Sequence, residues 1–296
     1  MGNILTKQFY RQRKDFEDSC AGRDAGLTFP EGVRCSTDIA YADDGIKAHM
    51  LDIYRPEDSQ EKVLPVIINV HGGGLIIGNK EFNRYFCALL CKKGFLVYSI
   101  EYRLIPDCLM YDQISDVYMA MDYIKERLAA DGGDSSHVYM AGDSGGACLI
   151  TYANAIQNST NIARAANVTP SGLRINALGL ISGMFYTSRF DKIGLFLPKY
   201  LYGRDYKKTS FAKYVNPENR ELLNSLAPVW LVTSHNDFLR RYTTDFEKAL
   251  TTAEREHELV AFPKNKKLTH AFSVFEPFLP ESSEVIDMMV EYFRKF

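Results

Sequence analysis

The chain has 296 residues, of which 46% are hydrophobic and 24% charged, with a formal net charge of −2 and a pI near 6.3. This balance gives no electrostatic reason to expect nucleic acid or an anionic membrane as a partner, and without a run of about 18 apolar residues we expect no stable membrane insertion. The six cysteines are scattered, which favours reduced core thiols in a cytoplasmic protein over a disulfide framework or a metal centre.

Helix and strand patterns alternate along the chain. A polar stretch up to about residue 30 favours a helix, and the segments CSTDIAYAD and IKAHMLDIY predict two strands that form one edge of a sheet. Further buried strands are predicted by the runs LPVIINV, FLVYSIEY, HVYMAG, LRINALGLIS, PVWLVTS and ELVAF. Helical patterns separate most of them. The alternation predicts one α/β domain over residues 1–296, with a mostly parallel eight-stranded sheet covered by helices on both faces.

One long segment interrupts this alternation. Residues 183–221 are rich in Phe and Tyr and are broken by Gly and Pro. Long insertions in such folds commonly carry function, so we expect this segment and residues 1–30 to form a cap over the active site. The alternative is a structural subdomain on the surface.

The sequence HVYMAGDSGGA contains the first chemical motif. Gly142-Asp143-Ser144-Gly145-Gly146 matches G-x-S-x-G between a buried strand and a small-residue helix, which is the setting that a nucleophile elbow requires. The same GDSGG surrounds the nucleophile of chymotrypsin-like proteases. Those proteases are all-β with the histidine upstream of the serine, so the α/β alternation excludes them. Ser144 is therefore the predicted nucleophile.

A glycine-rich turn supplies the second motif. The residues His71, Gly72, Gly73 and Gly74 follow a buried strand directly. Acyl transfer places negative charge on a former carbonyl oxygen, which preorganised backbone N–H groups can stabilise. We predict donors at Gly72, Gly73 and Gly145, and expect the His71 ring to hold the turn. A phosphate site is the alternative, but neither G-x-G-x-x-G nor Gly-Lys-Ser/Thr is present.

The predicted acid and base follow two late strands. Asp237 comes after PVWLVTS and His270 after ELVAF. This matches the chain order Ser, acid, His that accompanies a nucleophile elbow in an α/β fold. Both lie at carboxyl ends of strands, where the sites of open α/β sheets form. Asp245 on the following helix is the alternative acid. The other histidines lie at less suitable positions.

These motifs resemble the hormone-sensitive-lipase-like esterases of the α/β-hydrolase superfamily. The resemblance runs from about residue 38 to the C-terminus and includes HGGG, GDSGG (the family usually has Ala at the position of Gly145), LDIYRP at 51–56, YRLIP at 102–106, DFLR at 237–240 and HAF at 270–272. It implies a serine esterase with an α/β-hydrolase fold. The aromatic residues predicted to line the substrate pocket are Phe185, Tyr186, Phe238 and Phe272.

The predicted function is hydrolysis of short to medium acyl esters through an acyl-enzyme, with a small-molecule ester as partner and no metal or organic cofactor. Two alternatives stay open. Kynurenine formamidases that resemble this family cleave an amide on the same fold. The plant gibberellin receptors only bind a ligand, but they lack the triad histidine that His270 supplies here. The physiological substrate and the oligomeric state are not indicated by the sequence.

Overall fold

A computed structural model describes residues 2–59 and 62–296, so the first residue of the predicted N-terminal cap segment lies outside the described residues. The strands are β1 (Val33–Ala40), β2 (Met50–Pro56), β3 (Leu64–Val70), β4 (Leu96–Ile100), β5 (Gly133–Asp143), β6 (Ala177–Ile181), β7 (Val229–Ser234) and β8 (His257–Phe262). They form one eight-stranded sheet in the order β1-β2-β4-β3-β5-β6-β7-β8. The strands from β4 to β8 in this order pair parallel, whereas β1 and β2 form an antiparallel edge. The predicted mostly parallel sheet is confirmed.

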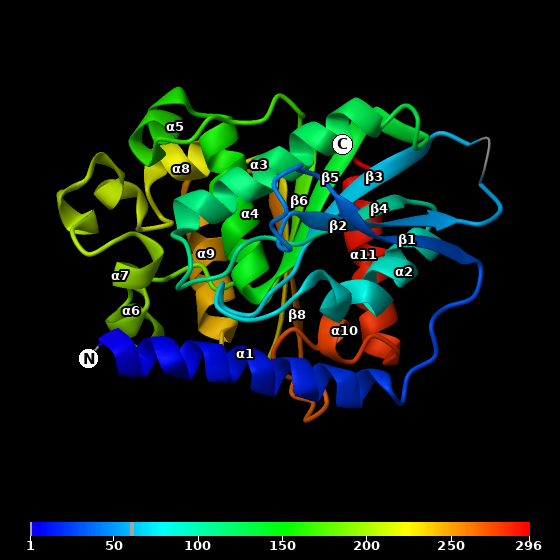
Figure 1. Ribbon diagram of the computed structural model, residues 1–296, viewed down its shortest axis with the longest axis horizontal. Helices are drawn as coiled ribbons and strands as arrows, with labels where there is room; N and C mark the ends of the chain where they lie inside the picture. The colour runs from blue at the N-terminus through cyan, green and yellow to red at the C-terminus, as the bar shows by residue number, and fades with distance from the viewer. Residues whose placement is uncertain (1, 60–61) are drawn as a thin grey trace.

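Helices cover both faces of the sheet (Figure 1). The described helices are α1 (Gly2–Asp24), α2 (Arg84–Lys92), α3 (Met110–Arg127), α4 (Ser144–Gln157), α5 (Thr160–Ala166), α6 (Lys192–Phe196), α7 (Pro198–Leu201), α8 (Arg220–Asn224), α9 (Arg240–Thr252), α10 (Phe272–Phe275) and α11 (Pro280–Phe293). Three short 3-10 helices lie at Lys80–Asn83, Tyr206–Lys208 and Ser210–Tyr214. The helices α3, α4 and α9 pack on one face, and α2, α10 and α11 pack on the other.

Alternating side chains of the central strands build the two cores. In β3, Val66 and Ile68 contribute to the core beneath α3 and α4, whereas Ile67 contributes to the core beneath α2 and α11. Successive side chains of a strand point to opposite faces of a sheet, so a strand covered on both sides is apolar throughout. Each fully buried aliphatic side chain of this size stabilises the fold by roughly 1.5–3 kcal/mol.

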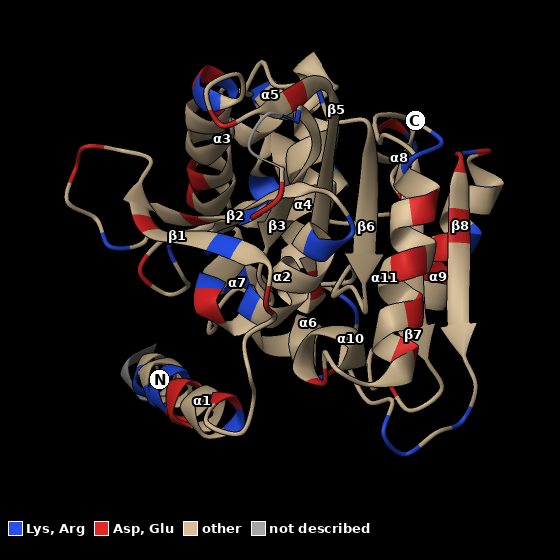
Figure 2. Ribbon diagram, turned by 90° about the vertical axis from the view of Figure 1, so that its right-hand side faces the viewer, with Lys and Arg blue, Asp and Glu red and all other residues tan. Residues whose placement is uncertain are grey.

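The carboxyl ends of the parallel strands lie at one end of the sheet, which we call the carboxyl edge. Figure 2 shows the arrows of β6, β7 and β8 pointing toward the same side of the molecule. The HGGG turn follows β3, Ser144 follows β5, and the segments with Asp237 and His270 follow β7 and β8. Four separate parts of the sequence therefore meet at this edge.

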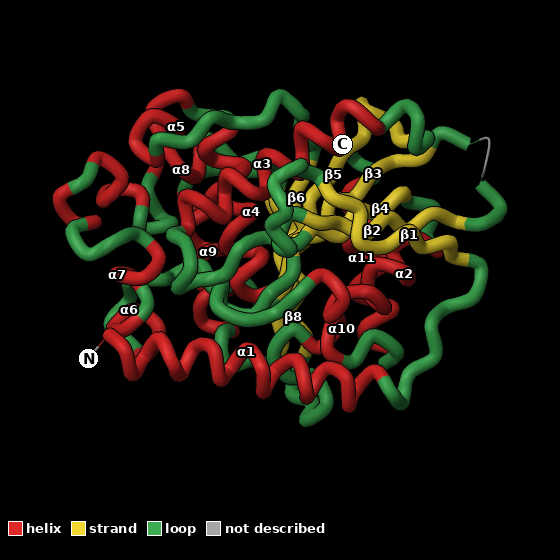
Figure 3. Tube along the Cα trace, in the orientation of Figure 1, coloured by secondary structure: helices red, strands yellow, loops and turns green. Residues whose placement is uncertain are grey.

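The helix α1 lies across that edge, and the segment between β6 and β7 faces it with short helices joined by loops (Figure 3). The Arg13 guanidinium fastens α1 by donating to the carbonyl oxygens of Ile76 at 2.8 Å and Ile105 at 2.6 Å. It also pairs with Asp107 at 2.8 Å. Near the start of α1, the Phe9 ring packs edge-on against Tyr200 with centroids 5.2 Å apart.

Candidate active site

Ser144 is the first residue of α4, in the tight turn that directly follows β5. Its φ of 50° falls in the left-handed region, which costs a non-glycine residue energy and is maintained only where the surroundings impose it. A side chain at Gly146 would place its Cβ 2.1 Å from the Val70 carbonyl oxygen and 2.5 Å from that of His71. Glycine there lets the turn pack against β3, so the serine projects from the sheet edge as a nucleophile elbow requires.

The three residues predicted as a triad lie together. The His270 Nε2 is 2.9 Å from the Ser144 Oγ, and its Nδ1 is 2.7 Å from the Asp237 Oδ1. Ser144 is 8% exposed and the Asp237 side chain is fully buried. At these distances the His270 imidazole can accept the proton of the Ser144 hydroxyl, and the Asp237 carboxylate can orient the imidazole ring.

Asp237 is held by more than the histidine. Its Oδ1 also accepts the backbone N–H of Leu239 at 2.8 Å, and its Oδ2 accepts the Thr233 hydroxyl at 3.1 Å. Burial raises the pKa of Asp237, but the hydrogen bond and charge of His270, helped by the Ser182 hydroxyl and the Leu239 N–H, lower it more, so the pKa lies below its ordinary value. The carboxylate is therefore ionised at neutral pH and fixes the orientation of the imidazole ring.

The HGGG turn lies beside Ser144, but one of its predicted oxyanion donors is already engaged. The backbone N–H of Gly72 donates to the buried Asp143 carboxylate at 2.9 Å, and a Cβ at Gly72 would lie 2.1 Å from that side chain. The prediction of Gly72 as a donor is therefore wrong. Gly73 and Gly74 both line the cavity at Ser144, and a Cβ on Gly145 would approach the Gly74 nitrogen to 2.8 Å.

Two further groups that the sequence analysis missed hold this turn. The Asp143 Oδ1 also accepts the side-chain amide of Asn83 at 2.9 Å. Burial raises the pKa of Asp143 above its ordinary value, although Asn83 and the Gly72 N–H favour the ionised form. The signal available in the sequence was a carboxylate between Gly142 and Ser144 at the end of a buried strand, which must find buried donors.

The His71 ring stabilises the turn from the other side, as expected. Its Nε2 is 3.0 Å from the Glu101 carboxylate, and the ring stacks on Tyr102 with centroids 4.4 Å apart. The Tyr102 hydroxyl donates to the His71 carbonyl oxygen at 2.8 Å. Burial lowers the pKa of His71, but Glu101 raises it more, so the pKa lies above its usual value.

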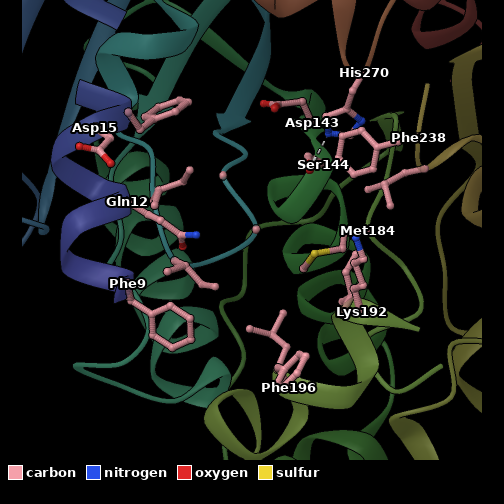
Figure 4. A pocket seen from close by; sticks show the side chains of 18 of the residues that line it. Phe9, Gln12, Asp15, Asp143, Ser144, Met184, Lys192, Phe196, Phe238 and His270 are labelled. Atoms are coloured by element: carbon pink, nitrogen blue, oxygen red, sulfur yellow. Dashed lines mark hydrogen bonds between the residues drawn. The ribbon is translucent and has the colours of Figure 1, made fainter. Parts of the chain in front are cut away.

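A mainly apolar cavity of about 720 Å³ opens in front of the serine (Figure 4). Figure 4 shows Phe9 and Gln12 of α1 on one side and Met184 and Ser144 on the other. The cavity is lined by Phe9, Gln12, Asp15, Phe16, Gly73, Gly74, Ile76, Ile77, Asp143, Ser144, Met184, Lys192, Ile193, Phe196, Leu197, Phe238, Leu239, His270 and Phe275. Its volume falls in the range of ligand pockets, which are mostly apolar with few polar groups.

Of the four aromatic residues predicted to line the pocket, only Phe238 does so, with its ring 4.3 Å from that of His270. The prediction for the other three is wrong. Phe185 stacks on Phe246 in the core, with centroids 4.2 Å apart. Tyr186 donates to Glu218 at 2.8 Å, and Phe272 packs against Phe262 at 5.2 Å. Many of the other lining side chains come from α1 and α6, within the two segments that were predicted to form a cap.

The alternative acid lies elsewhere. The Asp245 carboxylate pairs with Arg189 at 2.9 Å and with Arg241 at 3.5 Å. Among residues 2–59 and 62–296, no group of three or more His, Cys, Asp or Glu side chains could hold a metal ion. The six cysteines, all described, are free thiols.

Comparison with known proteins agrees with this geometry. A family model described as alpha/beta hydrolase fold matches residues 67–273. The chain is 29% identical over 184 residues to the probable isoprenylcysteine alpha-carbonyl methylesterase of Oryza sativa, covering 58% of this chain and 44% of that protein. It is 31% identical over 121 residues to the esterase LipC of Mycobacterium tuberculosis, covering 40% and 30%. The chain thus spans less than half the length of these two relatives.

Solved structures resemble the whole chain. Esterase B from Lactobacillus Rhamnosis has a TM-score of 0.92 at 22% identity, covering 100% of this chain and 96% of that one. An esterase of Pyrobaculum calidifontis has a TM-score of 0.71 at 22% identity, covering 97% and 92%. At such identities the likeness shows the fold. The family match covers most of the chain and carries the HGGG and GDSGG motifs, so the chain belongs to the α/β-hydrolase fold family, in its hormone-sensitive-lipase-like branch.

Proposed function

We propose that the protein is a serine-dependent carboxylic-ester hydrolase that acts on short to medium acyl esters through an acyl-enzyme. The observation that carries this proposal is the chain of contacts Ser144–His270–Asp237, with its two distances of 2.9 Å and 2.7 Å, at the wall of an apolar cavity. Curated relatives of the family that are named as esterases support it.

The proposed roles follow from the contacts. His270 Nε2 takes the proton of the Ser144 hydroxyl as the oxygen attacks the ester carbonyl, and Asp237 stabilises the imidazolium that forms. The alcohol then leaves with that proton. Water attacks the acyl-enzyme with His270 again as base, the bond between the acyl group and the Ser144 Oγ breaks, and the acid leaves as the Oγ regains a proton from His270. Each step uses a group already within hydrogen-bond reach.

The negative charge of the tetrahedral intermediate needs donors that no other group occupies. We propose the backbone N–H groups of Gly73, Gly74 and Gly145 for this role. Gly73 and Gly74 line the cavity, and the turn that holds them approaches Gly145 closely. Losing one such donor typically lowers kcat by about 10²–10³-fold.

The cap is part of the proposal. α1 contributes Phe9, Gln12 and Phe16 to the cavity, and the segment after β6 contributes Met184 and Phe196. These groups come from the two segments, residues 1–30 and 183–221, that the sequence analysis singled out. A closed apolar wall of this kind limits the length of acyl chain that fits.

The proposal is tested by covalent labelling of the full chain. A fluorophosphonate should modify Ser144, as found by mass spectrometry, and abolish hydrolysis of p-nitrophenyl butyrate. Ser144→Ala should lower kcat by roughly 10⁶-fold, because the members of a triad act as a unit. Ser136→Ala, at an exposed serine hydrogen-bonded to Asp134, is the matched control and should keep full activity. Label on another residue, or a folded Ser144→Ala protein with several per cent of wild-type turnover, would refute the assignment.

A further inference from the structure

The segment that faces α1 presents unusually apolar side chains to water. None of the five residues of α6 is buried. Leu195 is 56% exposed, Phe196 is 54% exposed, and Phe190, just before the helix, is 92% exposed. Single exposed apolar residues are ordinary, but a cluster of large ones marks an interaction site.

This cluster adjoins the opening of the cavity. Phe196 and Phe238 both line the cavity that contains Ser144, and Phe238 is 74% exposed. Phe190 and Leu195 line a separate depression of about 360 Å³. Figure 4 shows Phe238 above and Phe196 below the space in front of Ser144. We call Phe190, Leu195, Phe196 and Phe238 the rim surface.

Positive charges without acidic partners accompany the rim surface. In the described part of the chain, the exposed lysines that form no ion pair include Lys192 and Lys199, Lys207 in the depression that Phe190 and Leu195 line, and Lys264, Lys266 and Lys267 after β8. Lys192 belongs to α6 itself. Figure 2 shows the loop between β8 and α10, which holds residues 264–267, extending beyond the sheet edge in blue. The near-neutral net charge of the whole chain does not exclude such a group of lysines.

We propose that the rim surface adsorbs to an anionic phospholipid surface, so that an ester carried by the lipid passes directly into the cavity. Large apolar rings beside lysines are the composition of groups that insert at the boundary of headgroups and acyl chains. No helix of residues 2–59 and 62–296 is long and apolar enough to cross a membrane, and adsorption requires none. The delivery of substrate rests on the proposed function, whereas the adsorption itself does not.

The charges distinguish lipid from a second copy of the chain. Two copies joined through the rim surface would bring their unpaired lysines together, and like charges at an interface are unfavourable. Such a dimer would also cover the opening to Ser144. Anionic headgroups neutralise the same lysines and leave the opening directed at the source of substrate.

Sedimentation of the full chain with vesicles tests the proposal. We expect the protein to sediment with mixed phosphatidylglycerol–phosphatidylcholine vesicles more than with pure phosphatidylcholine, and less at high salt, because salt screens exposed charges. The double variant Phe190→Ser/Leu195→Ser should bind at least about tenfold more weakly, since adsorption scales with the apolar area that enters the interface. Neither residue lines the cavity, so hydrolysis of soluble p-nitrophenyl acetate should be unchanged.

The matched control is Val63→Ser. Val63 is 69% exposed but directly precedes β3, at the amino-terminal ends of the parallel strands and so opposite to the site. Its substitution should leave vesicle binding unchanged. A second variant, Lys264→Gln/Lys266→Gln/Lys267→Gln, should lose about tenfold or more of the binding to anionic vesicles, because basic residues near such a surface each contribute to attraction.

Three outcomes would overturn the proposal: no binding of the wild type to anionic vesicles, equal binding by the Phe190→Ser/Leu195→Ser variant, or a dimer in sedimentation velocity that this variant converts to a monomer. The last result would assign the rim surface to a contact between copies. Failure of the proposed function is separate, because it would appear as absent fluorophosphonate labelling of Ser144 with normal vesicle binding.

Discussion

The backbone N–H of Gly72 donates a 2.9 Å hydrogen bond to the carboxylate of Asp143, 71 residues further along the chain. This bond joins the turn after β3 to the elbow after β5, and Asn83 donates to the same oxygen. It removes Gly72 from the donors available to substrate, and it fixes how Gly73 and Gly74 face Ser144. Asp143 is thus a positioning residue for the turn.

Substitution of Asp143 tests this link. Asp143→Ala leaves the buried donors of Gly72 and Asn83 without an acceptor, which typically costs about 1–3 kcal/mol for each. We expect kcat for p-nitrophenyl butyrate to fall about 10–100-fold with a smaller change in KM, and Tm to fall by several degrees. Asp205→Ala, which removes only an exposed pair with Lys208, should change neither. An Asp143→Ala enzyme with wild-type kcat would contradict the assignment.

Gly145 stands where the family usually has alanine, and the structure leaves little space for one. A Cβ at this position would lie 2.8 Å from the backbone nitrogens of Gly74 and Leu75, closer than real side chains approach. Gly145→Ala should therefore push the proposed Gly74 donor outward and lower kcat by about tenfold or more, since small misplacements are costly in catalysis. The control is Gly22→Ala, where a Cβ meets nothing within 4 Å, and it should keep the wild-type kcat. Steady-state measurement of kcat for both variants tests the prediction.

The acid assignment is tested by comparing two substitutions. Asp237→Asn presents an amide to the His270 Nδ1 and should lower kcat by about 10⁴-fold, because the imidazole is then held in the wrong tautomer. Asp245→Asn removes only pairs with Arg189, Arg241 and Lys248 and should cost little. A larger loss at Asp245, measured as kcat under saturating substrate, would reverse the assignment.

The lowered pKa of Asp237 also predicts how stability depends on pH. An unfolded aspartate titrates near pH 3.9, whereas in the folded state burial raises the pKa and the contacts of His270 lower it more. The stabilisation from ionised Asp237 is complete above the unfolded value and disappears as pH falls through the folded one. The difference in unfolding free energy between wild type and Asp237→Asn should therefore shrink as pH is lowered from 6 toward about 3, as urea denaturation can measure. A difference that grows on acidification would contradict the direction of the shift.

Acyl length tests the cavity wall. With p-nitrophenyl esters we expect kcat/KM to be highest from acetyl to hexanoyl and to fall by decanoyl, because each added CH₂ gains only about 0.8 kcal/mol before it meets the wall. Phe196→Ala enlarges the cavity and should move the optimum to longer chains. Phe278→Ala, at a similarly exposed ring outside the cavity, should leave the profile unchanged. A wild-type optimum at dodecanoyl or longer would exclude a closed wall.

The sequence was most informative for features that a local pattern or the order of motifs determines. Buried runs such as LPVIINV predicted the strands, and the order of Ser144, Asp237 and His270 predicted which side chains meet. The errors concern groups whose role depends on distant partners. Nothing local to Gly72 indicates that Asp143 occupies its N–H. Phe185 has the composition of a pocket residue, but Phe246 packs against it in the core.

Arg13 gives α1, which precedes the sheet in this sequence, a late role in folding. Its guanidinium needs carbonyl oxygens as far as 92 residues downstream, and Phe9 needs Tyr200. During synthesis α1 therefore has no docking surface until the sheet and the segment after β6 have formed. Contacts so distant in sequence form slowly, and domains fold as they emerge from the N-terminus. The wall of the site that comes earliest in this sequence is thus completed last, and the newly made protein should gain the proposed acyl selectivity only after the sheet has folded.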